Sequence, residues 1–529
     1  MASKEDQLCQ RCSDIDLNKV FSGGYETPHL VIALGDVPQE QRKSYCGLCR
    51  LIAEAIYRPF CNEDLASYHD RCDLCDQVGP ERDDEPQSYL LVAVEIPLAK
   101  NRDSIGHSES SEYTDTTDMF KANPSRSKSQ AKATAALPAG KLDKGTFIAL
   151  KVARKRDPDA QVLSYFGSIY PAFSTPNIPS PARRVRSRLL NYSLLRLFLE
   201  ECQKNHSACN LTVDRVPIKK LRFLDCKTRR LKRAAPKDSF VALSYVWGER
   251  EELFDDSQLK RGKLPHTPWV VEDAMRVVTQ MGYRYLWVDK YCIPQGDEKV
   301  LHEHLCQMHL IYQRALFTIV AAAGTRAWHG LLGVSMRYRR GQTHAEINGR
   351  LLVSAVEPFL PTSQCKWNTR GWMYQEGLFS PRQLIFTAHQ VLFHCTEGEQ
   401  SEIVTEPVSW QVDKRPVRDL SVWNHIEAFS KRDLAYDHDV LDAIKATMTT
   451  YTHALGEGKD KNSERLDEST FEVISKDDAN SLERSSLGID FDRRVYTDSD
   501  CDSASTDSYD WGDDFITCQA TCGRDQRFF

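Results

Sequence analysis

Residues 240–249 read FVALSYVWGE. Its first four residues, 240–243, form a short apolar run that is typical of a strand buried on both faces. The run stops at Ser244, and Trp247 and Gly248 follow where a plain turn would need only small residues. The pattern predicts a buried strand whose end carries a functional surface.

The segments after this strand predict an α/β fold. Helical periodicity is present at 193–205 and 271–282, and the segment that starts at the N-cap candidate Asp297 continues it. Short apolar runs at 285–289 and 316–324 predict strands. Strands that alternate with helices indicate βαβ units, so we expect a parallel sheet.

Composition divides the 529-residue chain into several parts. We expect a small Cys-rich α+β region at 1–166 that contains an insert at 100–142, where large apolar residues are too few to support folding. A Pro/Ser-rich linker follows at 167–190. The α/β domain with a C-terminal helical extension covers 191–455, and a disordered acidic tail covers 456–529.

Bulk properties exclude several classes of protein. The net charge of −6 argues against a globally basic nucleic-acid binder, although residues 183–237 are rich in Arg and Lys. The sequence has neither an apolar run of about 18 residues nor an N-terminal signal core, so we expect a cytoplasmic protein with no membrane partner. Its 17 cysteines are then thiols or metal ligands.

Polar and aromatic residues follow the predicted strands. In a parallel sheet, ligands bind beyond the carboxyl ends of the strands. Arginine and indole groups suit phosphates and flat bases, and carboxylates suit ribose hydroxyls. The alternative is that these aromatic residues only seal the core. The candidate binding residues are Ser244, Trp247, Gly248, Asp289, Gln295, Arg370 and Trp372.

Two cysteine pairs have the spacing of a zinc site. Cys9 and Cys12 form one pair, and Cys46 and Cys49 form the other. Together they would supply the four thiolates of a structural Zn²⁺ site. The alternative is that they are small buried apolar residues.

Other cysteines have weaker spacing signals. One group contains Cys61, His69, Cys72 and Cys75, and another contains Cys202, His206 and Cys209. Cys292 lies in the loop after a predicted strand and is a candidate nucleophile.

Five motifs in order over 240–450 carry a family resemblance: YVWGE, YLWVDKYCIPQ, QMHLIYQRALFTIVAAAG, WNTRGWMYQEGLFSPRQLIFT and FSKRDLAYDHDVLDAI. The chain resembles the heterokaryon-incompatibility (HET) domain family. This resemblance implies a role in self/non-self recognition and induced cell death in filamentous fungi. HET domains are also distantly similar to Toll/interleukin-receptor (TIR) domains, which implies a flavodoxin-like parallel sheet and NAD as a substrate.

Cleavage of NAD would need a carboxylate near the ribose, because the transition state develops positive charge there. Glu298, at the start of a predicted helix, would be held ionised by the helix dipole, although it could simply favour that helix start. Glu376 is the other candidate. His302, His304 and Cys306 interrupt the polar stretch usual in the family, so the catalytic carboxylate stays open.

Two other functions remain open. A zinc-dependent nucleic-acid binder is suggested by the cysteine pairs and the basic residues of 183–237, although we do not expect nucleic acid as a partner. The chain could also be a catalytically inert scaffold. Its protein trigger or partner, including a second copy of itself, cannot be named from sequence.

Overall fold

The computed structural model describes residues 7–23, 25, 29–57, 89–97, 146–155, 163–172, 181–210, 218, 220–235, 238–248, 256–260, 262–335, 337–356, 365–405, 422–434, 443–444 and 447. The predicted insert at 100–142 and acidic tail at 456–529 lie outside these residues. So does the group Cys61, His69, Cys72 and Cys75.

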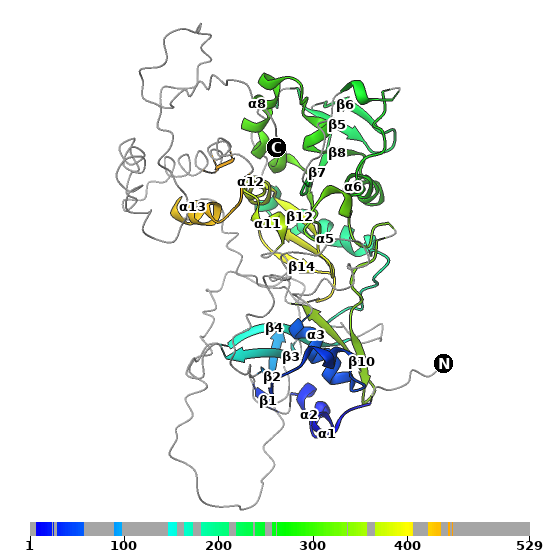
Figure 1. Ribbon diagram of the computed structural model, residues 1–529, viewed down its shortest axis with the longest axis vertical. Coiled ribbons are helices and arrows are strands. Elements are labelled where there is room, and N and C mark those ends of the chain that lie inside the picture. The colour runs from blue at the N-terminus through cyan, green and yellow to red at the C-terminus, as the bar shows by residue number, and fades with distance from the viewer. Residues whose placement is uncertain are drawn as a thin grey trace, which may run out of the picture. The chain divides into compact units, whose positions relative to one another are not determined.

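The N-terminal sheet contains six strands in the order β1-β2-β3-β4-β11-β10, and every pairing in it is antiparallel. The strands are β1 (His29–Gly35), β2 (Tyr89–Pro97), β3 (Thr146–Lys155), β4 (Leu163–Ala172), β10 (His344–Ile347) and β11 (Arg350–Val356). The β10–β11 hairpin therefore joins this sheet although it lies far along the chain from β1–β4 (Figure 1).

One face of this sheet is covered by helices from the first part of the chain. These are α1 (Gln10–Ser13), α2 (Leu17–Phe21), η1 (Gln39–Lys43) and α3 (Gly47–Tyr57). Helix α3 contributes Leu48, Leu51 and Ile52, which are fully buried, to the core on this face. Gly167 of β4 lets α3 approach closely, because a Cβ there would lie 2.8 Å from the Ala55 carbonyl oxygen.

The other face of the N-terminal sheet packs against two later segments. Phe147, Tyr170 and Val353 share a core with Ala182 and Ile403. The prediction of a linker at 167–190 is wrong over its first residues, because 167–172 belong to β4. Ile169, Tyr170 and Ala172 are buried apolar residues in that strand, and the density of Pro and Ser around them concealed the signal.

The second sheet contains eight strands in the order β14-β13-β12-β9-β7-β8-β5-β6. They are β5 (Arg222–Asp225), β6 (Arg230–Arg233), β7 (Phe240–Ser244), β8 (Tyr285–Trp287), β9 (Thr318–Val320), β12 (Arg382–Phe386), β13 (Val391–Cys395) and β14 (Glu399–Ser401). The central pairs β12–β9, β9–β7 and β7–β8 are parallel, and the flanking pairs are antiparallel.

The expectation of a parallel sheet is therefore correct only for the centre of this sheet. The connections between β5 and β6 and between β12 and β13 span only a few residues, too few for the crossover that parallel strands require. Taken over both sheets, most pairings are antiparallel. The fold is mixed α/β, and a parallel TIR-like fold is not confirmed.

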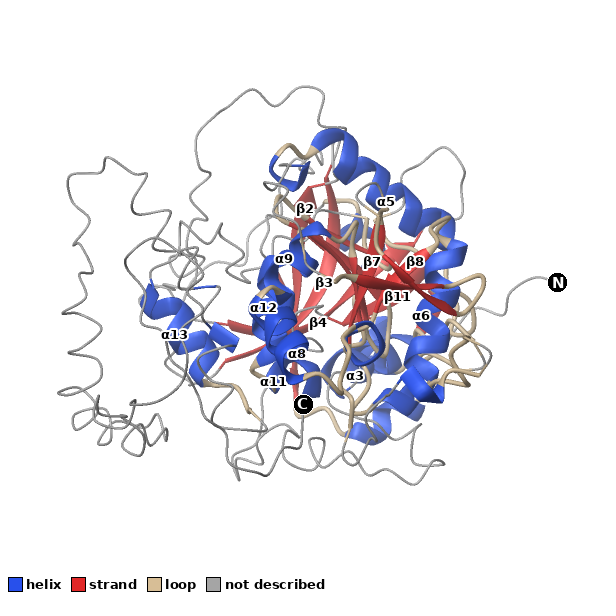
Figure 2. Cartoon of the chain, turned by 90° about the horizontal axis from the view of Figure 1, so that it is seen from above, coloured by secondary structure: helices blue, strands red, loops and turns tan. Residues whose placement is uncertain are grey.

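Helices cover both faces of the second sheet. Figure 2 shows α5 (Tyr192–Asn205) and α6 (Trp269–Gln280) on one side and α8 (Glu298–Cys306) and α9 (Met308–Arg314) on the other. The predicted helix starting after Asp297 is confirmed as α8, and Val300 N–H donates to the Asp297 side chain over 3.1 Å. None of the described helices has the length and apolar composition that a bilayer crossing requires.

Among the described residues, 369–375, 422–434, 443–444 and 447 belong to a separate compact unit. Helix α13 (Val422–Ser430) confirms the start of the predicted helical extension. Within this unit, the Tyr374 hydroxyl lies 2.6 Å from His425 Nδ1, and the Gly371 N–H donates to the Asp433 carbonyl over 2.7 Å.

Candidate functional site

The loop that follows β7 is bonded to the loops that follow its two neighbours. Trp247 Nε1 donates a hydrogen bond to Asp289 Oδ2, just beyond β8, over 2.9 Å. The Ala327 N–H, beyond β9, donates to the Trp247 carbonyl over 3.1 Å. Gly248 is left-handed (φ +102°), and a Cβ there would lie 3.0 Å from the Arg326 Cβ. The strand stops where it does because its exit loop joins both neighbouring exit loops.

The side chain of Ser244, at the very end of β7, is buried and accepts a hydrogen bond. Trp367 Nε1, from α11 (Lys366–Thr369), donates to Ser244 Oγ over 2.6 Å. Lys290, of the short helix α7 (Asp289–Cys292), is only 6% exposed, and its Nζ lies 5.5 Å from the centre of the Trp247 ring. This geometry is a cation–π contact in a water-poor environment, where such contacts are strongest.

Glu376, one of the two candidate catalytic carboxylates, is buried at 3% exposure. It lies close to Tyr312, whose hydroxyl donates to the Leu243 carbonyl over 3.3 Å. Burial, followed by the charges of Glu376 and Asp289, raises the pKa of Tyr312 well above its usual value. The phenol therefore stays protonated at physiological pH, and Glu376 belongs to a buried polar network beneath the strand ends.

The remaining predicted site residues lie in other places. Gln295 is half-buried and donates through Nε2 to the Ile293 carbonyl over 3.2 Å. Glu298 is the first residue of α8, and its side chain lies outside the described part of the structure. Arg370 and Trp372 belong to the separate unit that contains 369–375. The binding and catalytic roles assigned to these residues stay predictions.

The strand-end residues of the first unit thus form a packed polar junction. Ser244, Trp247 and Asp289 lie together, and Trp367 and Lys290, which are not among the candidate residues, contact Ser244 and Trp247. Tyr312, also not a candidate, donates to the neighbouring Leu243 carbonyl. Lys290 had a usable signal, because it directly follows Asp289 at a strand end. Tyr312 and Trp367 had none, since their contacts come from distant helices.

Two exposed tryptophan side chains lie at the start of α6 and in the short helix η6 (Ala327–His329) just beyond β9. Trp269 and Trp328 are 40% and 47% exposed. The centre of the His266 ring lies 5.3 Å from that of Trp269 and 6.4 Å from that of Trp328. The Arg337 guanidinium lies 5.5 Å from the Trp269 ring centre. A flat or apolar ligand group could stack on these rings.

Cys292 is not suited to act as a nucleophile. It is fully buried, and burial raises the pKa of its thiol to about 12. Its sulfur accepts from the Val288 N–H over 3.4 Å and lies 3.8 Å from the Leu286 carbonyl oxygen. At neutral pH this side chain is a neutral thiol that caps a strand end.

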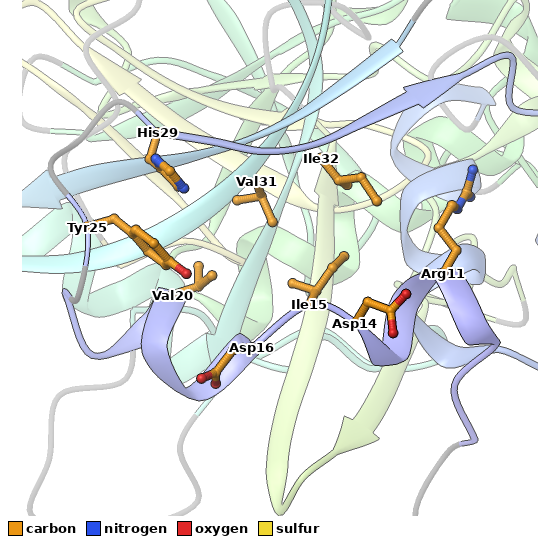
Figure 3. Close-up of a pocket in the computed structure, with 9 residues that line it drawn as sticks. All are labelled: Arg11, Asp14, Ile15, Asp16, Val20, Tyr25, His29, Val31 and Ile32. Carbon is orange, nitrogen blue, oxygen red and sulfur yellow. The ribbon is translucent and has the colours of Figure 1, made fainter. Parts of the chain in front are cut away.

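A hollow of about 210 Å³ lies on the N-terminal region (Figure 3). The Tyr25 and His29 rings stack at one end of it, with their centres 4.1 Å apart. Arg11 lines the other end and also reaches the Cys49 sulfur at 3.9 Å, so the hollow adjoins the cysteines. Its lining residues are Arg11, Asp14, Ile15, Asp16, Val20, Tyr25, His29, Val31 and Ile32.

The predicted zinc ligands Cys9, Cys12, Cys46 and Cys49 come together and are called the Cys9 cluster below. Their sulfur atoms all lie within 4.8 Å of one another. Cys49 Sγ is 3.7 Å from Cys9 Sγ and 3.6 Å from Cys12 Sγ. Tetrahedral Zn²⁺ with Zn–S bonds of about 2.3 Å separates its sulfurs by about 3.8 Å. The cluster therefore has the composition and spacing to hold a metal such as zinc.

Protonation of these thiols opposes metal binding. Hydrogen bonds to Cys46 and Cys49, together with burial, raise the pKa of Cys12, whereas the hydrogen bond to Cys12 lowers the pKa of Cys46. The thiols thus share protons, and a metal ion must displace them because the thiolate is the ligand form. Metal affinity is expected to fall as the pH falls.

Comparison with known proteins finds a family match, over the part of the chain that starts at β7. Residues 240–376 match the family model described as heterokaryon incompatibility protein (HET). This segment, about a quarter of the chain, is therefore similar to a HET domain. It is also similar to "Vegetative incompatibility protein HET-E-1" of Podospora anserina, with 24% identity over 249 residues. That match covers 45% of this chain and 16% of the Podospora protein. No solved structure matches.

Proposed function

We propose that this protein acts in heterokaryon incompatibility, where it takes part in self/non-self recognition and the induction of cell death. The observation that carries this proposal is the HET match over 240–376, which runs from the first residue of β7 to Glu376 and so spans the buried junction. The resemblance to a vegetative incompatibility protein supports it. The chain covers only 16% of that protein, so its trigger and partners are not transferred.

Inducible expression in a filamentous fungus tests the proposal. The parent protein should arrest growth and kill cells. Asp289→Asn removes the charge of the carboxylate that accepts from the Trp247 indole and the Lys290 backbone N–H, and it should reduce killing at equal protein level. Lys299→Ala, at an exposed position on α8, is the matched control and should kill as the parent does. A parent protein tolerated at high level would contradict the proposal.

NAD cleavage is a second, finer candidate activity. It is supported by the order β8-β7-β9-β12 of the parallel strands. The chain leaves β7 towards β8 and leaves β9 towards β12, in opposite directions, and in α/β folds nucleotides bind at the switch point between two such strands. Of the two candidate carboxylates, Glu298 at the start of α8 is favoured, because Glu376 is buried beside Tyr312. The carboxylate would stabilise positive charge on the ribose.

Release of nicotinamide from NAD by the purified full chain tests this activity. Glu298→Gln should abolish release with an unchanged fold, and Lys299→Ala should leave it unchanged. Full turnover in Glu298→Gln would exclude Glu298 as the catalytic carboxylate, and Glu376→Gln would then be tested in the same way. If the parent protein releases no nicotinamide, NAD cleavage is excluded as its activity. The protein would then act in cell death as a catalytically inert scaffold.

A zinc-dependent nucleic-acid binder has less support. Several basic side chains of 183–237 are used internally: Arg229 pairs with Glu272 at 2.6 Å, and Lys232 pairs with Asp238 at 2.8 Å. Salt-dependent retention on DNA or RNA would revive this function.

The partner and the cellular location are also proposals. We propose a cytoplasmic protein that responds to a protein trigger or to a second copy of itself. Light scattering of the purified chain tests self-association, and a fluorescent fusion in the fungal host tests location.

A further inference from the structure

A second group of potential metal ligands lies at the edge of the second sheet. Cys202, His206, Cys209 and Cys395, called the Cys202 cluster below, each offer a ligand atom, and these atoms all lie within 4.8 Å of one another. All four residues are buried. His206 Nδ1 is 3.2 Å from Cys395 Sγ. The spacing of the first three residues suggested a metal site, and Cys395 is the fourth ligand that the sequence analysis missed.

Local structure holds each of these side chains in place. Cys202 and His206 are one turn apart at the end of α5, and Cys209 follows in the short helix η4 (Ala208–Asn210). Cys395 ends β13, and its N–H donates to the Gly398 carbonyl over 2.9 Å in the turn to β14. The Ala208 N–H donates to Glu397 Oε1 over 2.6 Å, which joins that turn to η4.

A buried arginine provides a second observation. Arg382 is 6% exposed, and its Nε donates to Cys202 Sγ over 3.3 Å. Its other recorded hydrogen-bond acceptors are neutral: the Leu316 carbonyl at 3.4 Å and the Asn210 side-chain oxygen. A buried cation is costly unless an anion lies beside it. A thiolate at Cys202 would supply that anion.

We propose that the Cys202 cluster binds one structural Zn²⁺ through three thiolates and His206. Three thiolates and one Zn²⁺ leave one net negative charge, which the Arg382 guanidinium offsets. Four protein ligands fill the tetrahedral shell, so the site is structural and not catalytic. The ligands come from both sides of the HET match at 240–376, so the metal closes the chain around the HET domain.

Elemental analysis of the purified full chain and of serine variants tests this site separately from the Cys9 cluster. Cys395→Ser should lose one equivalent of zinc relative to the parent, whether or not the Cys9 cluster is loaded. Cys46→Ser should leave that equivalent in place. Cys226→Ser, at a half-buried cysteine outside both clusters, is the control and should lose none. Unchanged zinc content in Cys395→Ser would overturn the proposal.

A conservative variant decides the matter if Cys395→Ser does not fold. His206→Cys should still bind metal, and with Co²⁺ in place of Zn²⁺ it should absorb more strongly in the thiolate-to-cobalt charge-transfer region than the parent. An unchanged cobalt spectrum would overturn the proposal. Free thiols should also be counted in the denatured, unreduced parent, which has 17 cysteines. A count of 15 that Cys395→Ser restores to all of its remaining cysteines would mean that a disulfide occupies the cluster, and this too would overturn the proposal.

Discussion

The Cys9 and Cys202 clusters have similar ligands but close very different lengths of chain. Cys9 and Cys49 are 40 residues apart, and both pack in or against the core between the N-terminal sheet and its helices. His206 and Cys395 are 189 residues apart, and they join α5 to the edge of the second sheet. By the loop-closure relation, the longer crosslink constrains the unfolded chain by about 1.4 kcal/mol more. Similar ligand sets can therefore support one region locally or enclose a whole domain.

Loss of either cluster should give the largest effect. Cys395→Ser should lower the free energy of unfolding of the second sheet by more than about 3 kcal/mol, because a structural metal and its crosslink are lost together. Cys46→Ser should destabilise only the N-terminal sheet. Hydrogen exchange at β7 and β9, compared with β2 and β3, measures the two effects. Equal loss of protection in both sheets for either variant would show that the two clusters do not stabilise separate regions.

Acid should weaken the HET region through His329. Burial, followed by the charges of Arg337 and Arg326, lowers its pKa from 6.5 to about 4. In the unfolded chain His329 binds a proton near pH 6.5, whereas in the folded chain it does so only near pH 4. The free energy of unfolding therefore decreases as the pH falls from about 6.5 towards 4. The loss reaches about 3 kcal/mol.

Denaturant unfolding of the parent and of His329→Gln at several pH values checks this prediction. The variant should lack this part of the acid sensitivity, while acid release of metal should affect both proteins alike. The same slope with pH in both proteins would assign the acid sensitivity to other groups.

Gly167→Ala should act on the N-terminal region alone. The added Cβ would meet the Ala55 carbonyl oxygen at 2.8 Å, so α3 must shift away from β4 at a cost of about 2 kcal/mol. Gly341→Ala is the matched control, since a Cβ there meets nothing within 4 Å. Thermal unfolding of both variants measures the difference. A shift of the melting temperature as large in the control would show that α3 and β4 do not approach closely.

The smallest effect is expected at the helix that carries Glu298. Asp297→Ala removes the side-chain acceptor for the Val300 N–H and should cost about 1 kcal/mol. Lys299→Ala is the control in the same turn. Zinc content should not change in either variant, and a loss of metal from Asp297→Ala would show that α8 is coupled to a cluster.

Local signals predicted much of the second sheet. Helix α5 and strands β7, β8 and β9 lie close to their expected positions, because each has a short-range apolar pattern. Strand direction at the sheet edges was not predicted, since a short apolar run does not encode its orientation. The β10–β11 hairpin was missed although Asn348 and Gly349, at φ 52° and 69°, form the Asn-Gly turn that favours hairpins.

In the candidate sites, too, contacts that follow from local patterns were predictable and contacts between distant elements were not. The Cys9 cluster is predictable because each pair lies within a single turn of chain. Cys395 is not, because only the topology of the sheet brings it to α5. The contact between Trp247 and Asp289 follows from adjacent parallel strand ends, whereas the Trp367 contact with Ser244 comes from a distant helix. The choice between Glu298 and Glu376 rests on helix position and burial, because no local sequence pattern encodes which carboxylate meets a substrate.

The pairing of β11 with β4 has a consequence for how this protein can be cut or recombined. A breakpoint anywhere between Ala172 and His344 would leave the C-terminal fragment with a hairpin whose partner strand is on the other piece. The unpaired edge would present free N–H and C=O groups to other chains and invite aggregation. Deletion studies of the HET region should therefore keep residues 1–172 or remove 344–356 as well. Recombination that moves this region into another protein would have to keep β4 and the hairpin together, or lose both.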